Sequence, residues 1–180
     1  MTICAPKARV PSILGRGASD GITINAGMPN RRAAAHGGDW FAEAFVPGRE
    51  FNIAMLNGLV LPMAEMRFER WPDGKPRIVG YDAKWEDDSS GWNGTVRAFG
   101  VERDEPALAA ALQSACERVW SLFGLAGFAR VDFRVDESGM PQILEINANP
   151  CITPDAGFAA AAAEAGMAYD EVIEALVLAA

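Results

Sequence analysis

Near its C-terminus the chain alternates charged and apolar residues in two short runs, and this alternation constrains the fold more than any other feature. Successive residues of a β-strand point to opposite faces of a sheet, so Arg130, Asp132 and Arg134 share one face of the first run. Glu145 and Asn147 share a face of the second run in the same way. The Asp-Glu-Ser-Gly sequence between the runs is typical of a turn. The pattern predicts a β-hairpin with one polar and one apolar face.

The register of this hairpin follows from burial of its apolar face, because a slip by one residue would turn every apolar side chain outward. The expected pairs are Phe133 with Leu144, Val131 with Ile146, Asp132 with Glu145, and Arg130 with Asn147. Two carboxylates that meet in this way raise each other's pKa unless a cation lies between them. Carboxylate oxygens are hard ligands of the kind that suits Mg²⁺. The sequence therefore predicts a metal-binding hairpin.

Two other interpretations of the hairpin are open. In the first, it is half exposed and its polar face only meets water. The ending Glu-Ile-Asn-Ala-Asn-Pro weighs against this, since an ordinary edge strand has no need of such polar groups followed directly by proline. In the second, Asp132 and Glu145 form an acid/base pair of the glycosidase kind, which needs one carboxyl kept protonated near neutral pH. Arg130 opposes this, because a guanidinium lowers the pKa of a neighbouring carboxyl.

With these residues in view, the segment 127–150 resembles the metal-binding end of ATP-grasp carboxylate–amine ligases, most closely the D-alanine–D-alanine ligase branch. Two further segments follow the order of that family. Residues 41–52 look like its hinge strand and the strand after it, and residues 81–85 look like its lysine-bearing loop over the nucleotide. The resemblance covers roughly residues 15 to 178. It implies an α+β fold, with an ATP-grasp-like antiparallel or mixed sheet, flanking helices and the metal-binding hairpin.

The resemblance implies roles for single residues, with ATP and Mg²⁺ (or Mn²⁺) as cofactors. The metal ligands would be Asp132, Glu145 and Asn147. Arg130 would be the catalytic residue that stabilises an acyl-phosphate or a tetrahedral oxyanion. The nucleotide would be held by Glu43 at the adenine amino group, Glu50 at the ribose hydroxyls and Lys84 at a phosphate. Ser19 and Gly21 would belong to a phosphate-covering loop at residues 15–21, where small side chains let backbone N–H groups approach an anion.

The chain also departs from the family at several positions. Residues 11–14 replace the usual Lys-Pro strand, and Lys7 is too far from the loop to stand in for that lysine. Cys151 stands where dipeptide-forming members have glycine, and Ala156 stands where they place a serine for the substrate carboxylate. D-alanine as acceptor is therefore in doubt. The family members are longer than this chain, so a truncated, catalytically inactive ATP-binding module is the alternative to a working ligase, and a hydrolase with paired carboxylates is a third hypothesis.

We expect an irregular segment at residues 1–14 and one ATP- and metal-binding domain at residues 15–180. Strands are expected at 40–46, 49–57, 59–70, 77–81, 128–136 and 142–147, and helices at 105–123, 156–165 and 170–178. Asn57-Gly58 between two apolar runs predicts a tight hairpin. The apolar stripe of the long helix is expected to be Leu108, Leu112, Ala115, Val119 and Leu122.

Composition agrees with a cytoplasmic enzyme. The chain has 180 residues, half of them hydrophobic, which is enough for one sizeable core. Its net charge of −8 argues against nucleic acid, because neutralising phosphates needs a basic face. No apolar run has the roughly 18 residues of a membrane span. The expected partners are small-molecule carboxylate and amine substrates, with a homodimer as a further expectation.

Overall fold

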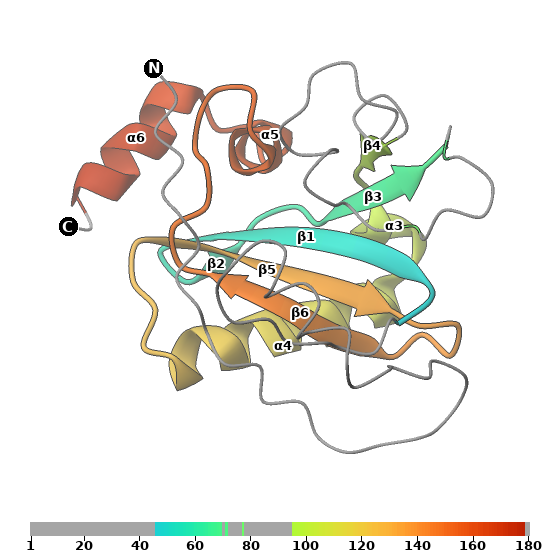
Figure 1. The fold of residues 1–180 in the computed structure, drawn as a ribbon. Helices are drawn as coiled ribbons and strands as arrows, with labels where there is room; N and C mark the ends of the chain where they lie inside the picture. Colours follow the sequence, from blue (N-terminus) through green and yellow to red (C-terminus); the bar gives the residue numbers. More distant parts are fainter. Residues whose placement is uncertain (1–45, 70, 72–76, 78–94, 179–180) are drawn as a thin grey trace, which may run out of the picture. The chain divides into compact units, whose positions relative to one another are not determined.

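The computed structural model describes residues 46–69, 71, 77 and 95–178 (Figure 1). Its sheet has the strand order β4-β3-β1-β5-β6, with β2 paired to β1, and every pairing is antiparallel. The strands are β1 (Arg49–Leu56), β2 (Leu59–Val60), β3 (Ala64–Phe68), β4 (Thr95–Ala98), β5 (Phe128–Val135) and β6 (Pro141–Asn147), and the helices are α3 (Val101–Asp104), α4 (Pro106–Leu122), α5 (Gly157–Glu164) and α6 (Tyr169–Leu178). The prediction of an antiparallel sheet with flanking helices is confirmed.

One face of the sheet packs against α4 and forms the larger core. Alternate residues of β1 and β5, among them Phe51 and Phe133, are fully buried there with Leu112 and Cys116 of the helix. Burial raises the pKa of the Cys116 thiol to about 12, so this cysteine behaves as a core residue rather than as a nucleophile. The predicted stripe of α4 is wrong at Leu122, which is 81% exposed because it lies at the C-terminal end of the helix.

Helices α5 and α6 cover only one end of the opposite face, as Figure 1 shows. Ala54 and Leu56 of β1 are buried there with Phe158 of α5 and Val172 of α6. The ring of Phe158 also packs edge-to-face on Phe128 of β5, with 5.8 Å between ring centroids. The same face continues along β1, β5 and β6 with polar residues, and this part carries the residues of the predicted metal-binding hairpin.

The predicted hairpin at Asn57-Gly58 is confirmed between β1 and β2. Asn57 has a φ of +50° and Gly58 a φ of +83°, the left-handed pair that a two-residue turn between twisted strands needs. The strand predicted over 59–70 is interrupted at residues 61–63, which follow β2 and have no regular secondary structure. Pro62 explains the break, because it has no N–H to donate to a ladder.

Two elements were not predicted. β4 has only four residues and begins in a stretch rich in turn-forming residues, while α3 is a single turn, too short for a helical period to be recognised. The strands predicted at 40–46 and 77–81 lie outside the described residues except for residues 46 and 77, neither of which is in a strand. Within the described ranges, no helix is long and apolar enough to cross a bilayer.

The register of the hairpin of β5 and β6 was predicted correctly for three of its pairs. Arg130 lies opposite Asn147, Val131 opposite Ile146, and Asp132 opposite Glu145. The expected pair of Phe133 with Leu144 is wrong, because the register shifts after Asp132 and Phe133 pairs with Ile143. Leu144 is the extra residue of this bulge and is 45% exposed. Because of the bulge, Leu144 lies outside the core while Glu145 still faces Asp132.

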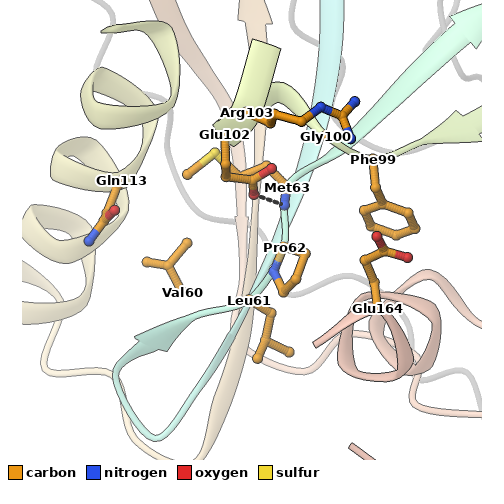
Figure 2. Close-up of a pocket in the computed structure, with 10 residues that line it drawn as sticks. All are labelled: Val60, Leu61, Pro62, Met63, Phe99, Gly100, Glu102, Arg103, Gln113 and Glu164. Carbon is orange, nitrogen blue, oxygen red and sulfur yellow. Dashed lines mark hydrogen bonds between the residues drawn. The ribbon is translucent and has the colours of Figure 1, made fainter. Parts of the chain in front are cut away.

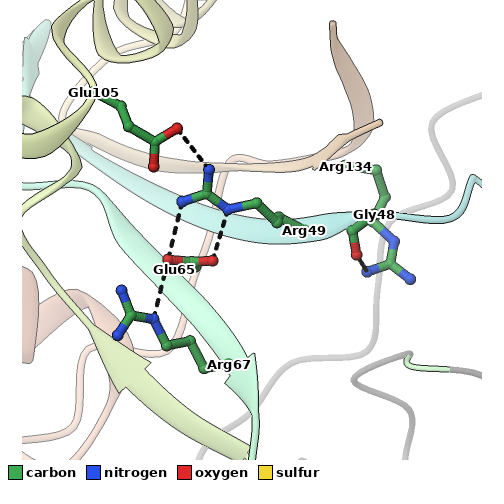
Figure 3. Close-up of polar contacts among 6 residues, drawn as sticks. All are labelled: Gly48, Arg49, Glu65, Arg67, Glu105 and Arg134. Atoms are coloured by element: carbon green, nitrogen blue, oxygen red, sulfur yellow. Dashed lines mark hydrogen bonds and ion pairs between the residues drawn. The ribbon is translucent and has the colours of Figure 1, made fainter. Parts of the chain in front are cut away.

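Polar contacts also tie β1, β3 and the start of α4 together (Figure 3). Arg49 donates hydrogen bonds of 2.8 and 3.1 Å to Glu65 and one of 2.8 Å to Glu105, and Arg67 donates one of 3.2 Å to Glu65. Burial of Glu65 would raise its pKa, but the hydrogen bonds and charges of the two arginines outweigh burial and lower it. This network braces the sheet on the side away from the polar face described below.

Candidate functional site

The polar residues of three neighbouring strands form rows across the second face of the sheet. The pairings of β1 with β5 and of β5 with β6 give the rows Glu50–Arg134–Gln142, Asn52–Asp132–Glu145 and Ala54–Arg130–Asn147. The middle row contains two carboxylates and one amide, and an arginine of β5 stands in each row beside it. Residues paired across antiparallel strands project to the same side of the sheet, so these groups share one surface. We call them the polar face.

Asp132 lies at the centre of the polar face and is only 4% exposed. Arg130, two residues away on the same strand, donates hydrogen bonds of 2.6 and 2.9 Å to its two carboxylate oxygens. Burial of Arg130 would lower its pKa, but the charge and hydrogen bonds of Asp132, with the more distant charges of Glu145 and Glu50, raise it. The site therefore holds a guanidinium permanently charged beside its carboxylates.

Glu50 and Arg134 form a second, more deeply buried pair in the adjacent row. The two residues are 6% and 2% exposed, and 3.7 Å separates Nη1 of Arg134 from Oε2 of Glu50. Arg134 also donates to the backbone carbonyls of Gly48, at 3.3 Å, and of Arg77, and Figure 3 shows the first of these contacts. Burial lowers the pKa of Arg134, and the charge of Glu50 partly offsets this. Arg134 is thus held by an ion pair and by carbonyls at once.

The chain turns directly after Asn147. Oδ1 of Asn147 accepts a hydrogen bond of 3.0 Å from the backbone N–H of Asn149, and Pro150 follows. This is the Asx type of turn, in which a side chain replaces a backbone acceptor. The Asn-Ala-Asn-Pro ending therefore stops β6 and fixes the Asn147 amide at the end of the polar face.

The donor atoms of the middle row fit a hard divalent cation. A carboxylate has about four lone-pair sites, so Asp132 keeps acceptor capacity beyond the two hydrogen bonds from Arg130. Glu145 stands opposite it across the strands, and Asn147 adds an amide oxygen at the next position on this face. Within the described ranges, no group of three histidine, cysteine, aspartate or glutamate side chains could hold a metal by itself. The set is thus two carboxylates and an amide, which suits Mg²⁺ better than Zn²⁺.

Four of the expected nucleotide-binding residues, Glu43, Lys84, Ser19 and Gly21, lie outside the described residues. The structure therefore brings together Glu50, Arg130, Asp132, Glu145 and Asn147 from the expected set. Asn52 also belongs to the polar face, although it was not among the residues predicted for the site. The alternation of β1, in which Asn52 stands between the buried Phe51 and Ile53, was the signal that could have found it.

A separate hollow of about 410 Å³ lies between the segment after β2 and helices α3, α4 and α5 (Figure 2). Two of the polar residues that line it already have partners within the chain. Oε1 of Glu102 accepts a hydrogen bond of 2.7 Å from the backbone N–H of Met63, and Arg103 forms an ion pair with Asp104 at 2.7 Å. None of the expected site residues lines it. We therefore place the candidate site on the polar face.

The chain is similar to proteins of one kind in sequence and in structure. Residues 29–178 match the family model described as D-ala D-ala ligase C-terminus. A D-alanine–D-alanine ligase of Laribacter hongkongensis is 34% identical over 129 residues, which are 72% of this chain and 38% of that protein. One of Anaeromyxobacter sp. (strain K) is 30% identical over 89% of this chain and 50% of that protein. The chain thus spans about two fifths to half of the length of these relatives.

Solved structures of the same kind share the fold. The crystal structure of D-alanine–D-alanine ligase from Bacillus anthracis complexed with ATP has a TM-score of 0.58 at 19% identity, over 76% of this chain and 39% of that one. The VanG D-Ala:D-Ser ligase from Enterococcus faecalis has a TM-score of 0.53 at 18% identity, over 75% of this chain and 37% of that one. The expected ATP-grasp-like fold is therefore confirmed.

Proposed function

Because this chain belongs to the family of D-alanine–D-alanine ligase C-terminal domains, we propose that it is the ATP- and metal-binding part of an ATP-dependent carboxylate–amine ligase. The observation that carries the proposal is the middle row of the polar face. There Asp132 and Glu145 stand opposite each other, with Asn147 at the end of the same strand and Arg130 bonded to Asp132. Such a set of oxygen donors beside a fixed guanidinium suits the charged groups of a phosphoryl transfer.

In the proposed reaction, an oxygen of the substrate carboxylate attacks the γ-phosphorus of ATP, and ADP leaves. The nitrogen of an amine then attacks the carbonyl carbon of the acyl-phosphate, and phosphate leaves with the electron pair of the broken C–O bond. Asp132, Glu145 and Asn147 would hold Mg²⁺ or Mn²⁺, which supplies neutralisation of phosphate charge when bound. The amino acids named by the relatives, D-alanine and D-serine, indicate small amino acids as the substrate class.

Arg130 is the proposed catalytic residue. Its guanidinium is oriented by two hydrogen bonds to Asp132, which leaves its remaining N–H donors free to meet a developing oxyanion. Because the group is oriented before substrate arrives, little reorganisation is needed when negative charge appears. Glu50 is proposed to accept hydrogen bonds from the ribose hydroxyls, and its ion pair with Arg134 would hold its carboxylate in position for this role.

The test is calorimetric titration of the chain with ATP in the presence of Mg²⁺. We expect Glu145→Gln to weaken the binding of Mg-ATP at least tenfold, because it removes one of two charged oxygen ligands. The control is Glu137→Gln, an exposed carboxylate in the turn of the same hairpin, which should leave the affinity unchanged. Equal affinity of the Glu145 variant and the unaltered chain would refute the metal assignment.

A further inference from the structure

Asn52 lies on β1 near the centre of the polar face. The strand pairings place it opposite Asp132 of β5 on one side and opposite Ala64 of β3 on the other. Residues paired across antiparallel strands project to the same side of the sheet with their Cβ atoms about 5 Å apart, so Asn52 and Asp132 are direct neighbours. Glu50 lies two residues away on the same strand and the same face, about 7 Å along it. Asn52 therefore stands between the carboxylate proposed for the metal and the carboxylate proposed for the ribose.

In the part of the chain that the structure describes, the side-chain amide of Asn52 has no hydrogen-bond partner. Both carboxylate oxygens of Asp132 accept hydrogen bonds from Arg130, and Ala64 has no polar side-chain group. Other polar residues of this face do have partners, in the pairs Glu50–Arg134, Asp132–Arg130, Gln142–Asp136 and Asn147–Asn149. Among the described residues, no fully buried side-chain nitrogen or oxygen atom lacks a partner. The unpaired amide atoms of Asn52 are therefore open to the surface, where a ligand can reach them.

The position of Asn52 matches the path of a phosphate chain. In the proposed function, Glu50 meets the ribose, while the metal held by Asp132 and Glu145 binds phosphate oxygens. The phosphate chain of ATP joins these two points, so it passes over the residue between them. An asparagine amide offers two N–H donors without a negative charge of its own. A third carboxylate at this position would instead repel the phosphates.

We propose that Asn52 is a nucleotide-binding residue whose amide N–H groups donate hydrogen bonds to phosphate oxygens of ATP. This inference rests on the proposed function and extends it to a residue that the resemblance did not imply. Hydrogen bonds to a charged acceptor are stronger than those between neutral groups, so one amide makes a measurable contribution to affinity. The bond would hold the phosphate chain between the ribose and the metal, and so align the γ-phosphate with the substrate carboxylate.

The experiment compares Asn52→Ala with the unaltered chain by calorimetric titration with two probes. One probe is Mg-ATP, and the other is Mg-tripolyphosphate, which carries the three phosphates without the nucleoside. We expect the variant to bind both probes about tenfold more weakly, because it loses a hydrogen bond to a charged group. The matched control is Gln113→Ala, which removes an exposed amide of α4, on the other side of the sheet, where it bonds to Glu117. That variant should bind both probes as the unaltered chain does.

Two further measurements do not depend on the alanine variant. In NMR spectra of the unaltered chain, the side-chain NH₂ signals of Asn52 should shift when Mg-tripolyphosphate is added, while those of Gln113 should not. Asn52→Asp keeps the shape of the side chain but replaces its donors with a charged oxygen, so it should bind both probes more weakly than Asn52→Ala does. If Asn52→Asp binds them as tightly as the unaltered chain, the residue acts through its oxygen on the metal and the inference is wrong.

The two probes also separate this inference from the proposed function. If Asn52→Ala loses affinity for Mg-ATP alone, the residue contacts the nucleoside; if it loses affinity for neither probe, it contacts no part of the ligand. Both results contradict the inference and leave the proposed function standing. Binding of Mg-tripolyphosphate that depends on Asn52, in a chain that does not bind Mg-ATP, would support the phosphate contact and contradict the ligase assignment. A chain that binds neither probe would contradict both.

Discussion

Replacing Phe133 with alanine is expected to lower the free energy of unfolding by about 3–5 kcal/mol, the usual cost of removing a buried phenylalanine. Phe133 is fully buried and pairs with Phe51 on β1, which is fully buried as well. The surrounding core includes Leu112 and Cys116 of α4, and a rigid helix limits how far the cavity can collapse. Urea denaturation followed by circular dichroism measures the change, provided that the slope with denaturant is similar for the compared variants.

The control for this prediction is Leu144→Ala on the facing strand. The sequence alone placed Leu144 opposite Phe133 in the core, but the bulge leaves it 45% exposed. Its replacement should therefore change the free energy of unfolding by no more than about 1 kcal/mol, as is usual for surface positions. A loss at Leu144 as large as that at Phe133 would mean that the bulge is absent and that the simple register holds.

The second large effect is expected at Arg134. Arg134→Met keeps much of the side-chain volume but removes the cation that lies 3.7 Å from the carboxylate of Glu50, which is 6% exposed. Removing one partner of a buried ion pair destabilises a protein by about 3–5 kcal/mol, because the other charge stays buried. The measurement is again urea denaturation. Arg67→Met is the matched control, since Arg67 is half exposed in its pair with Glu65 and should cost about 1 kcal/mol or less.

The double variant Arg134→Met with Glu50→Gln tests the physical reason for this effect. If the cost comes from a stranded charge, neutralising Glu50 should recover a large part of it, so the double variant should be more stable than the sum of the two single changes predicts. Strict additivity would show that Arg134 stabilises the fold through contacts other than this ion pair, such as its bonds to the carbonyls of Gly48 and Arg77.

The hairpin of β5 and β6 could be predicted from the sequence because a period of two distinguishes its faces. Asp132 and Glu145 face each other as expected, since burial of Val131 and Ile146 admits one register on that side of the bulge. The bulge itself could not be predicted, because an isolated extra residue such as Leu144 has the same hydrophobic character as its neighbours. The bulge changes the site little, because Glu145 still faces Asp132, but it places Leu144 outside the core.

Interactions between distant segments could not be predicted from the sequence, for a different reason. The ion pair of Glu50 with Arg134 needs the pairing of β1 with β5, strands about 80 residues apart, which no local pattern encodes. β4 was not predicted either, because it is short and its alternation is too brief to give a period. The place of its Arg97 beside Gly157 depends on the packing of α5.

The central claim is that Asp132, Glu145 and Asn147 hold the divalent cation that accompanies ATP. The most direct measurement is the broadening of backbone amide NMR signals by paramagnetic Mn²⁺ added together with ATP. We predict that the amides of residues 130–132 and 145–147 broaden first, that those of Glu117 and Arg118 on the exposed side of α4 stay sharp, and that Glu145→Gln removes the selective broadening. Equal broadening of both sets, or selective broadening that persists in the Glu145 variant, would contradict the claim.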